Sequence, residues 1–145
     1  MAAQLHVDAA AVFIVDDDPS VRDALSLLLR IEGFAPRAFG DAGSFLEAFR
    51  QRPPACVILD VNLPDESGLQ VLRELAAERT PPPVVVVSGY GDIATAVAAM
   101  KFGATDFLQK PFAASAMADR VREAVATYRR SRQEHIEGLA DFAGR

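Results

Sequence analysis

The chain has 145 residues, of which 50% are hydrophobic and 24% are charged, and this length and composition predict one folded domain with a full core. Its formal net charge of −5 argues against direct nucleic-acid binding, which needs a basic surface. The single cysteine, Cys56, excludes an internal disulfide and is typical of a reducing compartment. No apolar run reaches the roughly 18 residues of a membrane-spanning helix, and residues 1–10 lack the pattern of a signal peptide. We therefore expect a cytoplasmic protein without membrane contact.

Short apolar runs alternate with amphipathic segments five times along the chain. Each run is rich in the β-branched and aromatic residues that are typical of strands. The predicted strands are Ala11–Val15, Phe34–Phe39, Ala55–Leu59, Val84–Val87 and Thr105–Gln109. We place the second strand at a sheet edge because Pro36 cannot donate a hydrogen bond to a neighbouring strand. The third run is wholly apolar, which is typical of a central parallel strand buried on both faces.

The first predicted helix follows the first strand. Asp18 is expected to cap it, and Pro19 suits its first turn. Gly33 is expected to end it, because glycine readily adopts the conformation in which helices terminate. An apolar stripe with the spacing of one helix face comprises Val21, Ala24, Leu25 and Leu28.

The other predicted helices follow the remaining strands in the same way. The second spans Asp41–Gln51, with Phe45 and Phe49 facing inward. A loop at residues 63–68, with Pro64 and Gly68, precedes the third. The remaining apolar stripes are Leu69, Leu72 and Leu75 in the third helix, Ile93, Ala96, Val97 and Met100 in the fourth, which Gly103 ends, and the series from Ala113 to Tyr128 in the last.

Strands that alternate with helices predict βαβ units with right-handed crossovers and a parallel sheet. We therefore expect an α/β, doubly wound (βα)5 fold in a domain of residues 11–128. Residues 1–10 are expected to form an N-terminal tail. Residues 129–145 begin with a basic cluster, and we interpret them as a helical extension that frays into a linker.

Charged or polar residues follow four of the predicted strands directly. Asp16 and Asp17 follow the first strand, Asp60 the third, Ser88 the fourth and Lys110 the fifth. Because the carboxyl ends of parallel strands meet at the edge where open α/β sheets bind ligands, we expect these side chains to converge. Three carboxylates, a hydroxyl and an ammonium group suit a divalent metal and a phosphoryl group.

The acidic residues suit Mg²⁺, which prefers oxygen ligands and keeps several waters. We expect Asp17, Asp60 and the backbone carbonyl of Asn62 to bind it, with Asp16 orienting a metal-bound water. One carboxylate can also act as a nucleophile and form an aspartyl phosphate.

Phosphoryl transfer depends mainly on positioning and charge neutralisation. Lys110 offers a mobile positive charge, and the Ser88 hydroxyl offers a donor to a phosphoryl oxygen.

Four motifs carry a resemblance to a known family. They are Val15-Asp16-Asp17-Asp18, Leu59-Asp60-Val61-Asn62-Leu63-Pro64, Val87-Ser88-Gly89 and Gln109-Lys110-Pro111-Phe112. In this order and spacing, over about residues 12–125, the chain resembles the receiver domain of a two-component response regulator. The segments 89–92 and 100–104 resemble FixJ-type and nitrogen-regulator-type receivers. The resemblance implies a flavodoxin-like sheet with strand order 2-1-3-4-5.

The resemblance also implies a role for each site residue. Asp60 resembles the phosphoacceptor, and Asp16 and Asp17 resemble the acidic pair for Mg²⁺. Lys110 resembles the lysine that pairs with the phosphoryl group and acts with Asp60 in its transfer, and its bond to Pro111 is expected to be cis.

Two further residues resemble the switch of the family. Ser88 resembles the switch hydroxyl, where threonine is commoner, and Phe107 resembles the aromatic that turns inward on activation. Asp18 stands where glutamate is common. The face expected to change comprises Ala94–Lys101, Thr105–Phe107 and Ala118–Arg122.

These roles imply a phosphorylation switch rather than an enzyme, apart from autophosphorylation and autodephosphorylation. A sensor histidine kinase would phosphorylate Asp60, and the changed face would drive homodimerisation or an output. We expect the output to be transcription regulation by a helix-turn-helix domain absent from this chain, so that any contact with nucleic acid is made by that domain. The alternatives are a single-domain regulator or phosphorelay intermediate, and an interaction module that kept the fold without being phosphorylated.

Two enzymatic or cofactor-binding alternatives fit the sequence less well. An aspartyl-nucleophile phosphatase would have a second acid two residues after Asp60, where Asn62 stands. A nucleotide or flavin domain would have a glycine-rich loop after the first strand. Tyr90 is either a residue that controls water access to the site or an ordinary surface residue.

Overall fold

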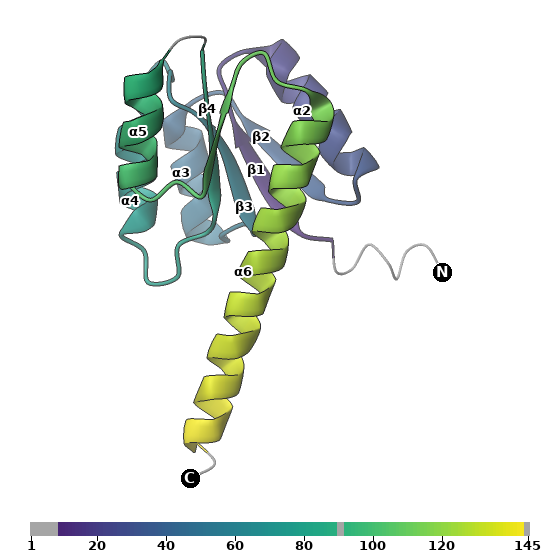
Figure 1. Cartoon of the computed structure of the whole chain (residues 1–145), viewed down its shortest axis with the longest axis vertical. Helices are drawn as coiled ribbons and strands as arrows, with labels where there is room; N and C mark the ends of the chain where they lie inside the picture. The colour runs from purple at the N-terminus through teal and green to yellow at the C-terminus, as the bar shows by residue number, and fades with distance from the viewer. Residues whose placement is uncertain (1–8, 90–91, 144–145) are drawn as a thin grey trace.

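The computed structural model of the chain describes residues 9–89 and 92–143. Five parallel strands form one sheet in the order β2-β1-β3-β4-β5, as predicted (Figure 1). The strands are β1 Ala11–Val15, β2 Ala35–Phe39, β3 Cys56–Asp60, β4 Val84–Ser88 and β5 Asp106–Gln109. The helices are α2 Pro19–Ile31, α3 Ala42–Gln51, α4 Gly68–Ala76, α5 Ile93–Lys101 and α6 Ala114–Ala143. The predicted α/β, doubly wound architecture is therefore confirmed.

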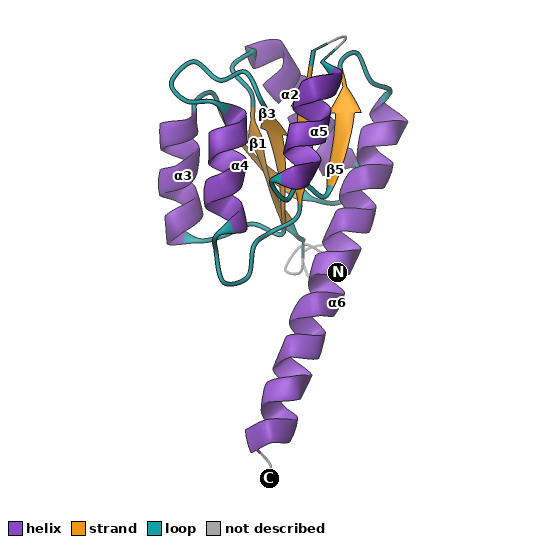
Figure 2. Ribbon diagram, turned by 60° about the vertical axis from the view of Figure 1, so that its left-hand side comes forward, coloured by secondary structure: helices purple, strands orange, loops and turns teal. Residues whose placement is uncertain are grey.

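Helices cover both faces of the sheet (Figures 1 and 2). On one face, α3, α4 and α5 enclose a core that includes Phe45 and Leu72, and on the other face α2 and α6 enclose a second core around Leu29 and Met117. The central strand β3 is buried along its whole length, as its apolar sequence predicted. The edge position of β2, predicted from Pro36, is also confirmed. This packing holds the ends of β1, β3 and β4 close together.

The start of α2 agrees with the prediction, but its buried face differs. The Asp18 side chain accepts a hydrogen bond from the Ser20 amide, so Asp18 is the N-cap. Leu25 is buried, whereas Ala24 is exposed, and Leu29, which the predicted stripe omits, is completely buried. Three consecutive leucines end at Leu29, and local periodicity does not determine which of them faces the sheet.

The apolar stripe of α5 lies at the surface instead of in the core. Ile93, Val97 and Met100 are 77%, 52% and 50% exposed, respectively. The helix contacts the core through the small residue Ala99, and Phe102 packs beside it. The predicted apolar stripe is therefore present on α5, but it faces away from the sheet and is exposed.

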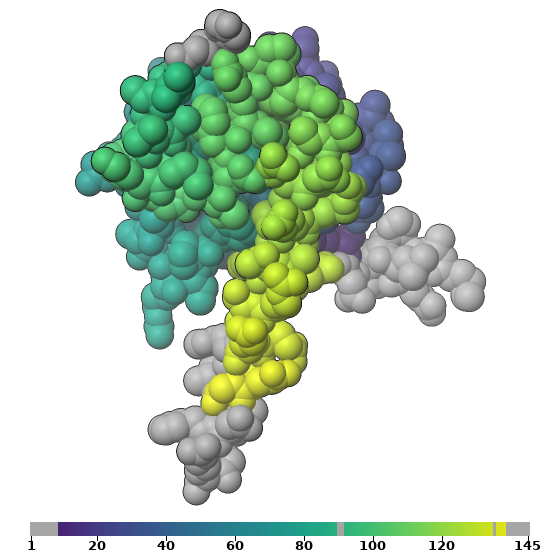
Figure 3. All heavy atoms as spheres, viewed as in Figure 1, coloured from purple at the N-terminus to yellow at the C-terminus, as the bar shows by residue number. Residues whose placement is uncertain are grey.

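The last helix, α6, is continuous for 30 residues. Its first half packs on the sheet through buried residues that include Met117, Val121 and Val125. Its second half projects beyond the body of the domain (Figures 1 and 3). The predicted extension after residue 128 is thus helical and continues α6 through residue 143, and its role as a linker stays a prediction. The domain boundary at residue 128 stays a prediction.

Parts of two predictions lie outside the described residues, namely Tyr90 and most of the N-terminal tail. Among the helices that are described, none is both long and apolar enough to cross a membrane.

Candidate functional site

The side chains that follow the strands meet at the carboxyl edge of the sheet. Asp16 comes directly after β1, Asp60 is the last residue of β3, and Lys110 comes directly after β5. The Lys110 ammonium group lies 2.8 Å from Asp16 Oδ2 and 3.0 Å from Asp60 Oδ2. These contacts join residues that are 94 and 50 positions apart in the chain. The predicted convergence is therefore present, and the Lys110–Pro111 bond is cis as expected.

Three carboxylates form a compact cluster of possible metal ligands. One oxygen from each of Asp16, Asp17 and Asp60 lies within 4.8 Å of the others. Asp16 and Asp60 are buried, and Asp17 is exposed. Three carboxylates beside one ammonium group leave an excess of negative charge, which a divalent cation would balance. Hard oxygen donors fit Mg²⁺, so the chemistry of this cluster agrees with the predicted metal.

Asp16 has a protein donor at each of its two carboxylate oxygens. Its Oδ1 accepts from the Asp18 amide at 2.9 Å, and its Oδ2 accepts from Lys110. Asp60 is bonded in the same way, by the Asn62 amide and Lys110, so the indirect role of Asp16 through a water stays a prediction. The Asp60 Oδ1 atom accepts from the Asn62 amide at 2.9 Å, and this bond places Asn62 beside the cluster.

Burial and charge act in opposite directions on the ionisable groups of the site. Burial raises the pKa of Asp60, and the nearby Asp16 charge adds to that rise, while hydrogen bonds from the Asn62 amide and Lys110 oppose it. Burial by itself would lower the pKa of Lys110, but its bonds to Asp16 and Asp60 and their charges raise it overall. Lys110 therefore stays protonated and offsets part of the negative charge of the cluster.

Ser88 brings an unsatisfied hydroxyl to the same edge. Its side chain is completely buried, and its Oγ atom has no hydrogen-bond partner within the described structure. An unsatisfied buried hydroxyl is destabilising by roughly 1–3 kcal/mol, so its presence calls for a functional reason. An acceptor oxygen that arrives at this edge would supply the missing partner.

The predicted switch aromatic lies on the strand next to Ser88. Phe107 in β5 pairs with Val86 of β4, and its half-buried side chain packs on the core below α3, α4 and α5. Ser88 is two residues beyond Val86, so it points to the same face of the sheet. Ser88 and Phe107 are thus neighbours across that face.

Gly68 lets α4 begin against the backbone of Asp60. A Cβ atom at residue 68 would lie 2.4 Å from the carbonyl oxygen of Asp60 and 2.4 Å from the Cα of Val61. The Gly68 amide donates to the Val61 carbonyl at 2.9 Å. The sequence prediction placed Gly68 in a loop, whereas in the structure it is the first residue of α4.

The sequence did not reveal the part that Arg22 plays in holding the site. Its Nη1 atom donates to the backbone carbonyl of Asp16 at 2.8 Å. Arg22 thereby fixes the turn that carries Asp16 and Asp17. Nothing in the local sequence distinguishes it from a solvated arginine on an exposed helix.

Comparison with known families and proteins yields consistent matches. The family model described as "Response regulator receiver domain" matches residues 12–122. The transcriptional regulatory protein FixJ of Bradyrhizobium diazoefficiens is 42% identical over 101 residues, which are 70% of this chain and 49% of that protein. The response regulator protein TmoT of Ectopseudomonas mendocina is 42% identical over 116 residues, which are 80% of this chain and 53% of that protein. The chain thus spans about half the length of these curated relatives.

Solved structures show the same fold. A crystal structure of NtrX from Brucella abortus matches with a TM-score of 0.81 and 37% identity over 90% of this chain and 29% of that one. A CheY-like receiver domain protein from Methanospirillum hungatei matches with a TM-score of 0.80 over 86% of this chain and 99% of that one. Its identity is 22%, so it supports the fold alone.

Proposed function

Because this chain belongs to the response regulator receiver domain family of two-component systems, we propose that Asp60 is its phosphoacceptor and that a sensor histidine kinase is the donor. The observation that carries the proposal is the bonding of Asp60, which is buried, contacts Lys110 and lies in the acidic cluster with Asp16 and Asp17. A carboxylate in this setting is held in place, and its neighbour in the cluster, Asp17, is exposed to solvent.

The transfer follows from the chemistry of a carboxylate nucleophile. An Asp60 oxygen attacks the phosphorus of a phosphohistidine, a P–O bond forms, and the P–N bond breaks with its electron pair going to the imidazole. Lys110 then pairs with a phosphoryl oxygen, and its positive charge compensates the negative charge of that oxygen. We assign Mg²⁺ to Asp17, Asp60 and the Asn62 carbonyl, with Asp16 acting through a water, and when bound it supplies neutralisation of the phosphoryl charge.

The switch is the response of Ser88 to the new phosphoryl oxygens. The Ser88 hydroxyl, which has no partner in the unphosphorylated structure described above, donates to one of them. Its movement frees space on the sheet face that it shares with Phe107, and Phe107 turns inward. A local change in charge and hydrogen bonding is thereby passed to a packed surface.

That surface comprises α5, β5 and α6, and we propose that it forms a homodimer on phosphorylation. The exposed apolar residues Ile93, Val97 and Met100 lie on it. By similarity to the transcriptional regulatory protein FixJ, we propose that the output of the whole protein is transcription regulation, exerted by a DNA-binding domain outside this chain. A single-domain regulator or phosphorelay intermediate is the alternative output.

The test is labelling of the purified chain by acetyl phosphate with and without Mg²⁺, followed by intact-mass measurement. We expect one phosphoryl group per chain, present only with Mg²⁺ and absent from the Asp60→Ala variant. Labelling of Asp60→Ala to the wild-type level would refute the assignment. Size-exclusion chromatography of the labelled chain tests the homodimer, which Met100→Glu is expected to abolish without preventing labelling.

A further inference from the structure

The loop between β3 and α4 is tied to a distant helix by one acidic side chain, Asp65. Its Oδ1 atom accepts a hydrogen bond from the Ala42 amide at 2.9 Å. Its Oδ2 atom accepts from the Gly43 amide at 3.0 Å. Both amides belong to the first turn of α3, which lies 23 and 22 residues earlier in the chain. The two bonds hold this loop against α3.

Capping of α3 does not by itself account for these bonds. The first amides of a helix lack partners within it, and one capping side chain usually serves them. Asp41 already caps α3 by accepting from the Ser44 amide at 2.7 Å. Asp65 adds a second carboxylate from another part of the chain, and its bonds to Ala42 and Gly43 lower its pKa. The second cap restrains the loop that carries it as well as the helix.

The same loop carries a predicted metal ligand three residues before Asp65. The Asn62 amide donates to the Asp60 carboxylate, and Asn62 pairs with Ser67 in an isolated β-bridge that closes the loop. Beyond it, Gly68 lies against the Asp60 backbone. The loop is therefore fixed at both ends, and Asp65 fixes it in the middle. Asp65 lies between Asn62 and Ser67, the two residues of the bridge, so its bonds to α3 restrain the loop that carries the Asn62 carbonyl.

We propose that Asp65 is a positioning residue for the phosphoryl-transfer site, which acts by holding the Asn62 carbonyl where a divalent cation needs it. This inference rests on the proposed function. Removing a side chain that supports metal ligands weakens metal affinity by about 10- to 100-fold, and we expect the lower value for Asp65→Ala because Asp17 and Asp60 are unchanged. Asp65→Asn keeps one oxygen acceptor and should restore part of the affinity.

The experiment measures Mg²⁺ binding to the unphosphorylated full chain by titration calorimetry, and amide hydrogen exchange of residues 61–67 without metal. The matched control is Asp41→Ala, which removes the other cap of α3 and leaves the loop contacts in place. We expect Asp65→Ala to weaken Mg²⁺ binding about tenfold and to speed exchange in the loop. Asp41→Ala should do neither.

Two results would overturn the proposal: wild-type Mg²⁺ affinity in Asp65→Ala, or equal weakening in Asp41→Ala, which would reduce the role of Asp65 to helix capping. The proposed function is judged separately. If wild-type chain binds Mg²⁺ but acetyl phosphate does not label it, phosphoryl acceptance fails, while the affinities of the variants still decide the role of Asp65. Absence of Mg²⁺ binding by the wild-type chain would overturn both.

Discussion

The two edges of the sheet are built from the same strands but use their polar groups differently. At the carboxyl edge, Asp16, Asp60 and Lys110 are buried or half-buried together, and the hydroxyl of Ser88 has no partner there among the described residues. This arrangement is poor for stability, since it concentrates charge and leaves a donor unused.

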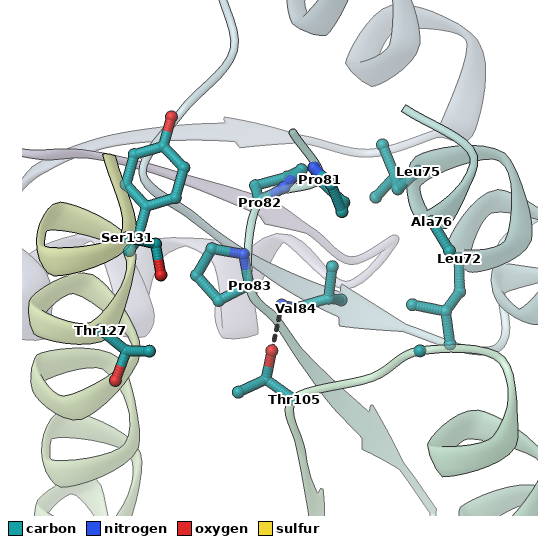
Figure 4. Close-up of a pocket in the computed structure, with 12 residues that line it drawn as sticks. Leu72, Leu75, Ala76, Pro81, Pro82, Pro83, Val84, Thr105, Thr127 and Ser131 are labelled. Carbon is teal, nitrogen blue, oxygen red and sulfur yellow. Dashed lines mark hydrogen bonds between the residues drawn. The ribbon is translucent and has the colours of Figure 1, made fainter. Parts of the chain in front are cut away.

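The amino edge is lined mainly by apolar side chains, and its Thr105 hydroxyl has a hydrogen-bond partner (Figure 4). A groove of about 400 Å³ lies between the end of α4, the turn Pro81–Pro83 and α6. Leu75 lines it, and Thr105 accepts a hydrogen bond from the Val84 amide at 3.1 Å, so this hydroxyl has a partner. The comparison indicates that the amino edge serves packing and that the carboxyl edge gives up some stability for function, as binding sites often do.

The largest loss of stability is expected from a substitution at the amino edge. Leu75 is 1% exposed, and its replacement by alanine leaves a cavity beneath α4. We expect Leu75→Ala to lower the free energy of unfolding by about 3 kcal/mol, measured by urea denaturation. The folded variant should still be labelled by acetyl phosphate at the wild-type rate, and a large loss of rate would mean that the two edges are not separable.

A substitution at the carboxyl edge should instead slow labelling by acetyl phosphate. Lys110→Ala removes the cation that contacts Asp16 and Asp60, and we expect the labelling rate to fall about 100-fold. Lys101, the other lysine of the chain, is exposed on α5, and Lys101→Ala is the control that should keep the wild-type rate. Equal rates for the two variants would contradict a role for Lys110 in the transfer.

Removing the hydroxyl of Ser88 and removing that of Thr105 should change the free energy of unfolding in opposite directions. Ser88→Ala removes a buried donor without a partner and should raise the free energy of unfolding by about 1 kcal/mol. Thr105→Val removes a satisfied acceptor and should lower it by about 1 kcal/mol. Urea denaturation of both variants measures the difference, and a destabilised Ser88→Ala would show that the hydroxyl has a partner in the resting protein.

The smallest effect concerns Cys56, at the amino end of the strand that ends with Asp60. Burial raises the pKa of its thiol from 9.0 to about 12. The folded pKa is the higher one, so burying the neutral Cys56 thiol contributes fully to the free energy of unfolding below pH 9.0. That contribution is lost as the pH rises towards about 12. At neutral pH a thiol-specific reagent should leave the folded chain unmodified and react after denaturation, and rapid modification of the folded chain would contradict the burial.

The convergence of the site residues could be predicted because the local sequence around each one identifies its position at the end of a strand. Asp16, Asp60, Ser88 and Lys110 each end or follow an apolar run, and a parallel sheet brings such positions to one edge. The order of the strands could not be obtained in this way, since periodicity identifies a strand without naming its neighbours. It came from the resemblance to receivers.

Other features depend on contacts that no local pattern encodes. In the sequence Asp65 has the pattern of an ordinary turn residue. Its partners Ala42 and Gly43 lie in α3, on the other side of β3 in the chain. The periodicity of α5 was correct, but periodicity shows only that an apolar face exists and not what covers it. The exposed Val97 and the buried Leu29 are both consequences of packing between elements, which sequence patterns describe least well.

The central claim is that Asp60 receives the phosphoryl group, and it is tested most directly by locating the acyl phosphate. Borohydride reduces an aspartyl phosphate to homoserine, which peptide mass spectrometry can assign to one residue. After incubation with acetyl phosphate, conversion is predicted at Asp60 alone and only when Mg²⁺ is present. Conversion at Asp16 or Asp17, or labelling without any conversion at Asp60, would contradict the account.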